Sequence, residues 1–383
     1  MRPGLRRLGL FGVAVGAAWW LLLGDTRLFF FRFPQPPNPA DFSLYFLAAR
    51  VGIEHGWSHL YDIGLQRAEY FKIHSQGDPY GWFTYYITPP PVAWLVAPLT
   101  LLGYPLAYYV WTGLNCVAYG IAGWFAAPGD RLARAAVVLA GATTFPFLIG
   151  LQNGQVTILL TACVVACWVA LRPGREGLAG LALVPLLFKP QVAYLVPLVL
   201  LLHGRFRTIV TWVGLSALLA LAALASLGSS GIGEWQSALG AETGHPENQI
   251  WTLAYLLGLG PLGLLVEAAA ALLVLGIAWL RRRRTLELSL AAALIGSLLA
   301  APYHQSSDAV VLLGALWLYL RASPPAWHWA WLGLGFVVSF LGAPLGPRPI
   351  LVFAAGWLLL CAQLAWRDLR PAGAMAAAPV VAA

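Results

Sequence analysis

Long apolar blocks separated by short polar intervals recur along almost the whole chain. A helix needs about 20 apolar residues to cross a bilayer, and lipid offers no hydrogen bonds to exposed peptide groups. The pattern therefore predicts an all-α, polytopic transmembrane bundle of about 11 to 13 membrane segments, with residues 1–383 forming a single integral membrane domain. The blocks lie at residues 8–24, 88–102, 105–127, 132–150, 154–171, 177–188, 191–202, 207–228, 261–280, 285–301, 307–321, 326–342 and 349–366.

The composition agrees with a chain that lipid surrounds. Hydrophobic residues make up 60% of the sequence and charged residues 10%, with a mean hydropathy of +0.74, which is outside the usual range of soluble domains. The net charge of +8 comes from short arginine clusters between apolar blocks, a pattern that indicates membrane topology rather than nucleic-acid binding. The four cysteines lie inside apolar blocks, so we expect neither a disulfide framework nor a zinc site.

Two longer polar intervals, residues 25–87 and 229–250, interrupt this pattern. The apolar run that precedes the first interval lacks a clear cleavage site, which predicts an uncleaved first helix. Placing the arginine clusters in the cytoplasm puts both intervals and the turn at 303–308 outside. We therefore expect a multi-pass plasma-membrane protein whose polar chemistry lies on the external face. Residues 88–128 fit either one crossing or two.

The first external interval contains the pattern of an amphipathic helix. Asn38 can cap this helix, Pro39 suits its first position, and aromatic residues recur on one face from Phe42 onward. The pattern predicts a helix that lies on the membrane surface. Asp41, in its first turn, either complements the helix dipole or acts as a general base toward a sugar hydroxyl.

Lys189 lies inside an apolar stretch and is followed directly by Pro190. The proline predicts two short half-crossings, within residues 177–202, that meet at a break and line a cavity. A charge inside a membrane segment is costly, which makes Lys189 a candidate functional group. Its ammonium suits a lipid-linked phosphate, unless it only extends to an interface at a helix end.

Three further polar residues lie between apolar blocks. His304, in a short external turn, could bind a donor phosphate or an incoming hydroxyl, or could simply be solvated. Asn153 and Gln155 could offer amide groups to a sugar, although an ordinary loop explains them equally well. His55 and His59 have the i, i+4 spacing of metal ligands on a helix, but no third ligand accompanies them, so we expect no metal site.

The order of these residues resembles that of glycosyltransferase family 87, whose members are bacterial GT-C-type transferases. The family includes polyprenyl-phosphate-mannose-dependent α-mannosyltransferases. The resemblance covers most of the chain, but Thr157 stands where an Asn is expected, and His304 lacks the usual Trp-rich context. The matching sequences are Asp41-Phe42 with Tyr45, Gly56 ahead of Leu60-Tyr61-Asp62, the proline-containing stretch 85–91, Gly154-Gln155, Ala179-Gly180 ahead of Lys189-Pro190, and His304 after Pro302.

By this resemblance, Asp41 occupies the catalytic-base position of the family, and His304 matches a histidine of functional importance. Lys189 matches the Lys-Pro of the middle segment, and its contact with a donor phosphate follows from its chemistry. The implied reaction is inverting transfer of a hexose, with mannose expected, from a polyprenyl-phosphate sugar to a hydroxyl of a glycolipid or glycan. Such a reaction requires the lipid-linked donor as co-substrate, and we expect neither a cofactor nor a metal.

Two other classes of protein are compatible with the same pattern. A multi-pass transporter or lipid flippase would also have many helices, a broken segment and an intramembrane lysine. Carriers often contain internal repeats, and the sequence contains no convincing one. A non-catalytic assembly factor with the same fold would tolerate the loss of Asp41.

Overall fold

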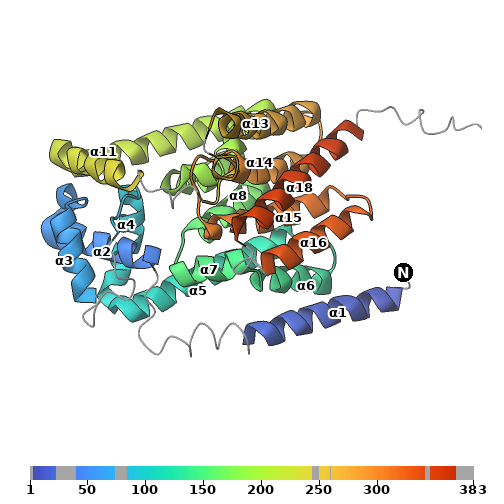
Figure 1. Cartoon of the computed structure of the whole chain (residues 1–383), viewed down its shortest axis with the longest axis horizontal. Helices are drawn as coiled ribbons and strands as arrows, with labels where there is room; N and C mark the ends of the chain where they lie inside the picture. Colours follow the sequence, from blue (N-terminus) through green and yellow to red (C-terminus); the bar gives the residue numbers. More distant parts are fainter. Residues whose placement is uncertain are drawn as a thin grey trace, which may run out of the picture.

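The computed structural model describes residues 3–22, 40–73, 84–243, 250–258, 260–340 and 346–367. Within these ranges every regular element is a helix, which confirms the predicted all-α fold (Figure 1). The elements are α1 (Pro3–Trp20), α2 (Ala40–His55), η3 (Trp57–His59), α3 (Ile63–Ile73), α4 (Pro90–Val96), η4 (Ala97–Leu102), α5 (Tyr104–Ala126), α6 (Arg131–Ala142), α7 (Phe145–Asn153), α8 (Thr157–Leu171), α9 (Glu176–Leu183), η5 (Val184–Phe188), η6 (Pro190–Val192), α10 (Leu195–Leu202), α11 (Phe206–Thr243), α12 (Leu253–Leu256), α13 (Pro261–Arg281), α14 (Glu287–Leu299), η8 (Ser306–Val310), α15 (Val311–Arg321), α16 (His328–Phe340) and α18 (Pro347–Arg367).

Membrane character is evident from the length and composition of several helices. Among the described residues, α11, α13 and α18 are long and apolar enough to cross a bilayer, and α6 with α7, bent by 63°, would provide a fourth span. Other apolar blocks form shorter helices of 10–17 residues, among them α8, α14 and α16. At 1.5 Å per residue these fall short of a hydrocarbon core about 30 Å thick. The predicted count of about 11 to 13 segments therefore exceeds the number of full-length spans.

The predicted break at Lys189-Pro190 is present. The short helix η5 ends at Phe188, Lys189 adopts φ −155° and ψ 73°, and η6 begins at Pro190. These dihedral angles are not helical, because the proline ring disfavours the α conformation at the residue before it. The break directs the lysine side chain into the protein at the point where two short apolar helices meet.

In the second predicted external interval, residues 229–250, the part up to Thr243 is helical rather than an irregular loop, and its external position stays a prediction. Helix α11 continues to Thr243 across a bend at Gly228, where φ is 62°. This continuation packs against η3, and Trp235 stacks on Tyr61 with ring centroids 5.4 Å apart. Contact with the first external interval thus keeps a polar sequence helical, which local composition alone does not indicate.

Helix α2 is confirmed as a helix, but its predicted position on the membrane surface is wrong. Residues 42–49 are all buried by protein, so every face of this part of α2 is covered, while residues 53–55 at its end are exposed. It packs against α3, α4 and η4, and Phe42 contacts the aromatic rings of α5. The reason is that apolar residues also fill the positions between the predicted stripe, and a helix that is apolar all round is typically buried.

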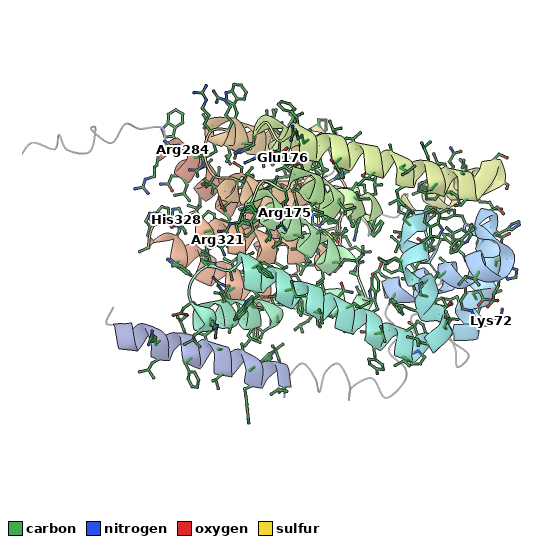
Figure 2. The ribbon with its side chains drawn as sticks, turned by 180° about the vertical axis from the view of Figure 1, so that it is seen from behind. Lys72, Arg175, Glu176, Arg284, Arg321 and His328 are labelled. Atoms are coloured by element: carbon green, nitrogen blue, oxygen red, sulfur yellow. The ribbon has the colours of Figure 1, made fainter. Side chains whose placement is uncertain are left out.

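The helices divide between two ends of the bundle. Helices α2, α3 and α4 lie together at one end, beside the last turns of α11 (Figure 1). Helix α14, buried from Leu288 to Leu299, forms the centre with α15. Lys72 of α3 lies at the α2 end, whereas Arg284 and Arg321 lie toward the opposite end (Figure 2). Helices α8 and α15 connect the two ends.

Candidate active site

Polar side chains from four separate parts of the chain meet at the α2 end of α8 and α15. Lys189 Nζ lies 2.6 Å from Asp308 Oδ1 and donates a second hydrogen bond of 3.3 Å to Gln155 Oε1. Gln155 in turn donates from Nε2 to Gln305 Oε1 at 2.7 Å, and its amide lies near enough to Asp41 to favour the ionised carboxylate. The structure therefore brings together Asp41, Gln155 and Lys189, which the sequence singled out separately.

Asp308 accepts hydrogen bonds on both carboxylate oxygens. Oδ1 accepts from Lys189 Nζ and from Thr157 Oγ1 at 2.7 Å, and Oδ2 accepts from the backbone N–H of Gln305 at 2.9 Å. Burial opposes ionisation, but the ammonium of Lys189 and the donor from Gln305 hold the pKa of the Asp308 carboxyl below its usual value. Asp308 is thus a fixed anion beneath the site.

Asp41 has a different environment, although it lies in the same group. Burial raises the pKa of the Asp41 carboxyl to about 6, against the nearby charge of Lys189, while the charge of Asp308 adds to the increase. Its side chain is only partly covered, whereas Asp308 is 1% exposed. A carboxyl of this kind is ionised near neutral pH and is also a better proton acceptor than an ordinary aspartate.

His304 reaches the same region from the turn before η8. It is 3% exposed, and its Nδ1 lies 3.5 Å from the carbonyl oxygen of Gln305. Burial lowers the pKa of the His304 imidazole to about 4, so the ring is neutral at pH 7. A neutral imidazole can exchange hydrogen bonds with a substrate, but it adds no positive charge beside a phosphate.

Asn153 is the predicted site residue that the structure does not connect to this group. It is the last residue of α7 and is half-buried. Within the described part of the chain, it makes no hydrogen bond to Asp41, Gln155 or Lys189. Its role in binding a sugar therefore stays a prediction that rests on its position beside Gly154.

The turn between α7 and α8 explains how Gln155 comes to face Asp41. Gly154 ends α7 in the left-handed conformation, with φ 68°. A Cβ atom on this residue would lie 2.4 Å from the Cβ of Phe42, so only glycine allows α2 to approach the turn this closely. Trp111 Nε1 also donates to the Gly154 carbonyl oxygen at 2.8 Å. The turn is thereby held between α2 and α5.

Gly154→Ala is expected to destabilise the protein by about 2–5 kcal/mol, because it combines left-handed backbone strain with overpacking. Gly174→Ala is the matched control, since its φ is 77° but nothing lies within 4 Å of the added atom. The control should cost only the strain, about 1–2 kcal/mol. Thermal unfolding in detergent measures both variants, and equal losses of stability would contradict the proposed close contact with Phe42.

The principal site residue that sequence reasoning missed is Asp308. In the sequence it is only the last residue of a polar turn, although in the structure it is the ion-pair partner of Lys189 across 119 positions of sequence. Thr157, where the family resemblance fails, proves to donate to the same carboxylate. The one available signal was the buried lysine itself, because a cation in an apolar interior calls for an anionic partner.

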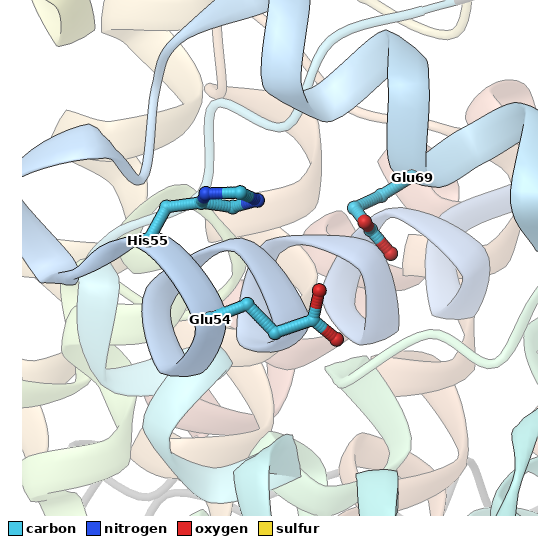
Figure 3. A group of neighbouring side chains, drawn as sticks. All are labelled: Glu54, His55 and Glu69. Carbon is cyan, nitrogen blue, oxygen red and sulfur yellow. The ribbon is translucent and has the colours of Figure 1, made fainter.

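Figure 3 shows Glu54, His55 and Glu69, whose ligand atoms lie within 4.8 Å of one another. Both carboxylates are already paired with cations. Arg50 lies 2.6 Å from Glu54 and 3.1 Å from Glu69, and Lys72 also contacts Glu69. The group is therefore explained as an ion-pair network that joins α2 to α3.

His55 and His59 do not share a helix, contrary to the geometry that their spacing suggested. Helix α2 ends at His55, Gly56 has φ 97°, and His59 lies in η3. His59 instead lies near Asp62 and Glu234, with ligand atoms within 4.8 Å. The left-handed glycine breaks the helix, so the i, i+4 relation carries no information about a metal here.

Comparison with known proteins places these observations in a family. Searches of curated proteins and of solved structures found no match. A family model described as glycosyltransferase family 87 matches residues 83–302, which is more than half of the chain and includes Gln155 and Lys189. The all-helical, membrane-embedded fold agrees with the expectation drawn from the sequence resemblance. This chain is therefore a glycosyltransferase and belongs to glycosyltransferase family 87.

Proposed function

We propose that the chain is an inverting transferase that moves a hexose, with mannose expected, from a polyprenyl-phosphate donor to a hydroxyl of a glycolipid or glycan. Beyond family membership, one observation supports the proposal. A carboxyl group with a raised pKa, Asp41, lies among buried polar groups at the end of an apolar bundle. Such a site can meet a lipid-linked sugar at the boundary between bilayer and water.

The proposed reaction is a single displacement. Asp41 accepts the proton of the acceptor hydroxyl while its oxygen forms a bond to the anomeric carbon. The bond between that carbon and the phosphate oxygen breaks, and polyprenyl phosphate leaves with the electron pair. Attack opposite to the leaving group inverts the configuration. No metal or cofactor is required in this scheme, since the leaving group is already a stable phosphate monoester.

Lys189 and His304 would hold the donor phosphate in different ways. Two of the three N–H groups of Lys189 have acceptors, Asp308 and Gln155, so a third can donate to a phosphate oxygen. The neutral imidazole of His304 would contribute a hydrogen bond. Asn153 and Gln155 remain candidates for contact with the sugar or phosphate through their amide groups.

The proposed location is the external face of the plasma membrane. Thr157 and Asp308 lie at the beginning of α8 and α15, whereas Arg172 and Arg321 lie at the other ends of these helices. If the arginine-rich end is cytoplasmic, as the positive-inside rule predicts, the site opens outward. We propose that residues 1–383 act as one multi-pass integral membrane domain.

The rate of transfer should depend on pH through Asp41. The base must be ionised to accept a proton, and burial raises the pKa of Asp41 to about 6. We therefore expect kcat/KM to fall about tenfold per pH unit below pH 6, and to be nearly constant from pH 7 to 8. Initial rates between pH 4.5 and 8 test this. A profile that stays flat down to pH 4.5 would argue against Asp41 as the base.

The test of the proposed function is transfer by the purified chain in liposomes. The assay supplies polyprenyl-phosphate-mannose, labelled in the sugar, with membrane glycolipids as acceptors, and includes a chelator. Labelled glycolipid supports the proposal. Transfer only from another polyprenyl-phosphate hexose corrects the sugar. Movement of the labelled donor between leaflets without transfer from any donor would favour the carrier hypothesis.

A further inference from the structure

The ion pair between Lys189 and Asp308 fixes the position of the lysine side chain in the protein interior. The side chain of Lys189 is 11% exposed and that of Asp308 is 1% exposed. Asp308 also accepts from Thr157 and from the backbone of Gln305. With three donors on one carboxylate, Asp308 is an anchor that fixes the direction of the lysine ammonium.

Gln155 has its amide oriented by its neighbours on both sides. Its Oε1 accepts from Lys189, and its Nε2 donates to Gln305 and faces Asp41. A flipped amide would put the NH₂ group against an ammonium and the oxygen against a carboxylate, so the observed orientation is the only one with complementary partners. A change at Lys189 therefore reaches Asp41 both through the Gln155 amide and directly through the charge of the ammonium.

We propose that Asp308 is a positioning residue for transfer: by anchoring Lys189, it orients the Gln155 amide toward Asp41 and keeps Lys189 from pairing with Asp41 directly. This inference rests on the proposed function, in which Asp41 is the base. With Lys189 and Asp308 both ionised, their charges cancel, and Asp41 carries the remaining negative charge of the group. Without Asp308, the ammonium would neutralise Asp41 and make it a weaker base.

Several elements contribute charged or titratable groups around Asp41. Lys189 comes from the break between η5 and η6, and Asp308 comes from η8. Tyr45, one turn along α2, is within electrostatic range of Asp41. The remaining groups in this neighbourhood are Tyr86, Tyr303 and His304. Among them, Lys189 and Asp308 form the ion pair, so the two have the largest expected influence on Asp41.

The inference can be tested without any substrate. Dicyclohexylcarbodiimide modifies protonated carboxyl groups in apolar surroundings, and mass spectrometry of the Asp41 peptide gives the extent of modification at each pH. We expect the midpoint of modification to fall by about one pH unit in Asp308→Asn, which removes a negative charge near Asp41. Lys189→Met should shift the midpoint upward by a similar amount. The opposite signs separate an effect of charge from a general loosening of the fold.

Two further variants serve as controls. Asp130→Asn also converts an aspartate to its amide, but Asp130 caps α6, about 20 Å or more away along α5, and asparagine retains the cap. Its midpoint should equal that of the wild type. If Lys189→Met does not fold, the double variant Lys189→Met/Asp308→Asn replaces it. Because this variant removes both charges, its midpoint should lie above that of Asp308→Asn and close to that of the wild type.

Transfer measurements on the same proteins distinguish the two proposals. If the wild type transfers sugar and Asp308→Asn lowers both the rate and the midpoint of its acid limb, both proposals are supported. If no donor is used but the modification midpoints shift as expected, the function is wrong and the positioning role of Asp308 stands. If Asp308→Asn has the wild-type midpoint, the inference is overturned, whatever its rate of transfer.

Discussion

Asp41→Asn is expected to reduce the turnover of sugar transfer by about 10²–10⁴-fold, the usual contribution of a positioned general base. Asparagine has nearly the same volume as aspartate, so the packing of α2 should be retained. Its amide cannot accept a proton from the acceptor hydroxyl at any pH of the assay. The measurement is the rate of transfer at saturating donor, with the unfolding temperature of each protein determined in parallel.

The matched control for Asp41→Asn is Glu54→Gln, on the same helix. Glu54 pairs with Arg50 near the other end of α2 and is 39% exposed, so its replacement should change the rate less than twofold and the stability by less than about 1 kcal/mol. If Asp41→Asn transfers sugar at the rate of this control, the base lies elsewhere. A rate that falls equally in both variants would indicate damage to α2 rather than loss of a base.

Lys189→Met should be the most destabilising single substitution in the site, by about 3–5 kcal/mol. Methionine fills the volume of the lysine stem, but the carboxylate of Asp308 then remains buried with no opposite charge. The loss is therefore the cost of an uncompensated anion in the protein interior rather than the net contribution of the pair. Thermal or denaturant unfolding in detergent measures it.

The double variant Lys189→Met/Asp308→Asn shows where that loss comes from. Removing both charges leaves a neutral amide with a single oxygen. This oxygen can accept from Thr157 or from the backbone N–H of Gln305, but not from both, because the two donate to different carboxylate oxygens in the wild type. We expect the double variant to regain most of the stability lost in Lys189→Met, because coupled residues are not additive. Equal unfolding temperatures for the single and double variants would mean that the buried charge is not the cause.

Much of the site could be predicted from the sequence, because its members are unusual where they stand. A lysine before a proline inside an apolar block, and an aspartate at the start of a short helix, are conspicuous by local pattern alone. Gln155, Lys189 and Asp41 were therefore recognised singly. Their mutual contacts were not, since a hydrogen bond between side chains far apart in sequence leaves no periodic signal.

The fold was predicted well where composition decides it and poorly where tertiary contact does. Apolar blocks gave the all-α membrane class directly. The burial of residues 42–49 of α2 was not predicted because their polar surroundings suggested a surface, although apolar residues occupy nearly all of these positions. The helical continuation of α11 beyond Gly228 brings Trp235 against Tyr61, a contact between residues far apart in sequence that the polar composition of residues 229–243 does not indicate.

The separation of Lys189 and Asp308 along the chain has a consequence for biosynthesis. Lys189 leaves the ribosome 119 positions ahead of its carboxylate partner, which at 5–20 residues per second is a delay of roughly 6–24 s. Throughout that time the apolar segment around residue 189 carries a cation with no Asp308 to neutralise it. An incomplete chain therefore presents an unpaired lysine to the insertion machinery, and the finished chain does not.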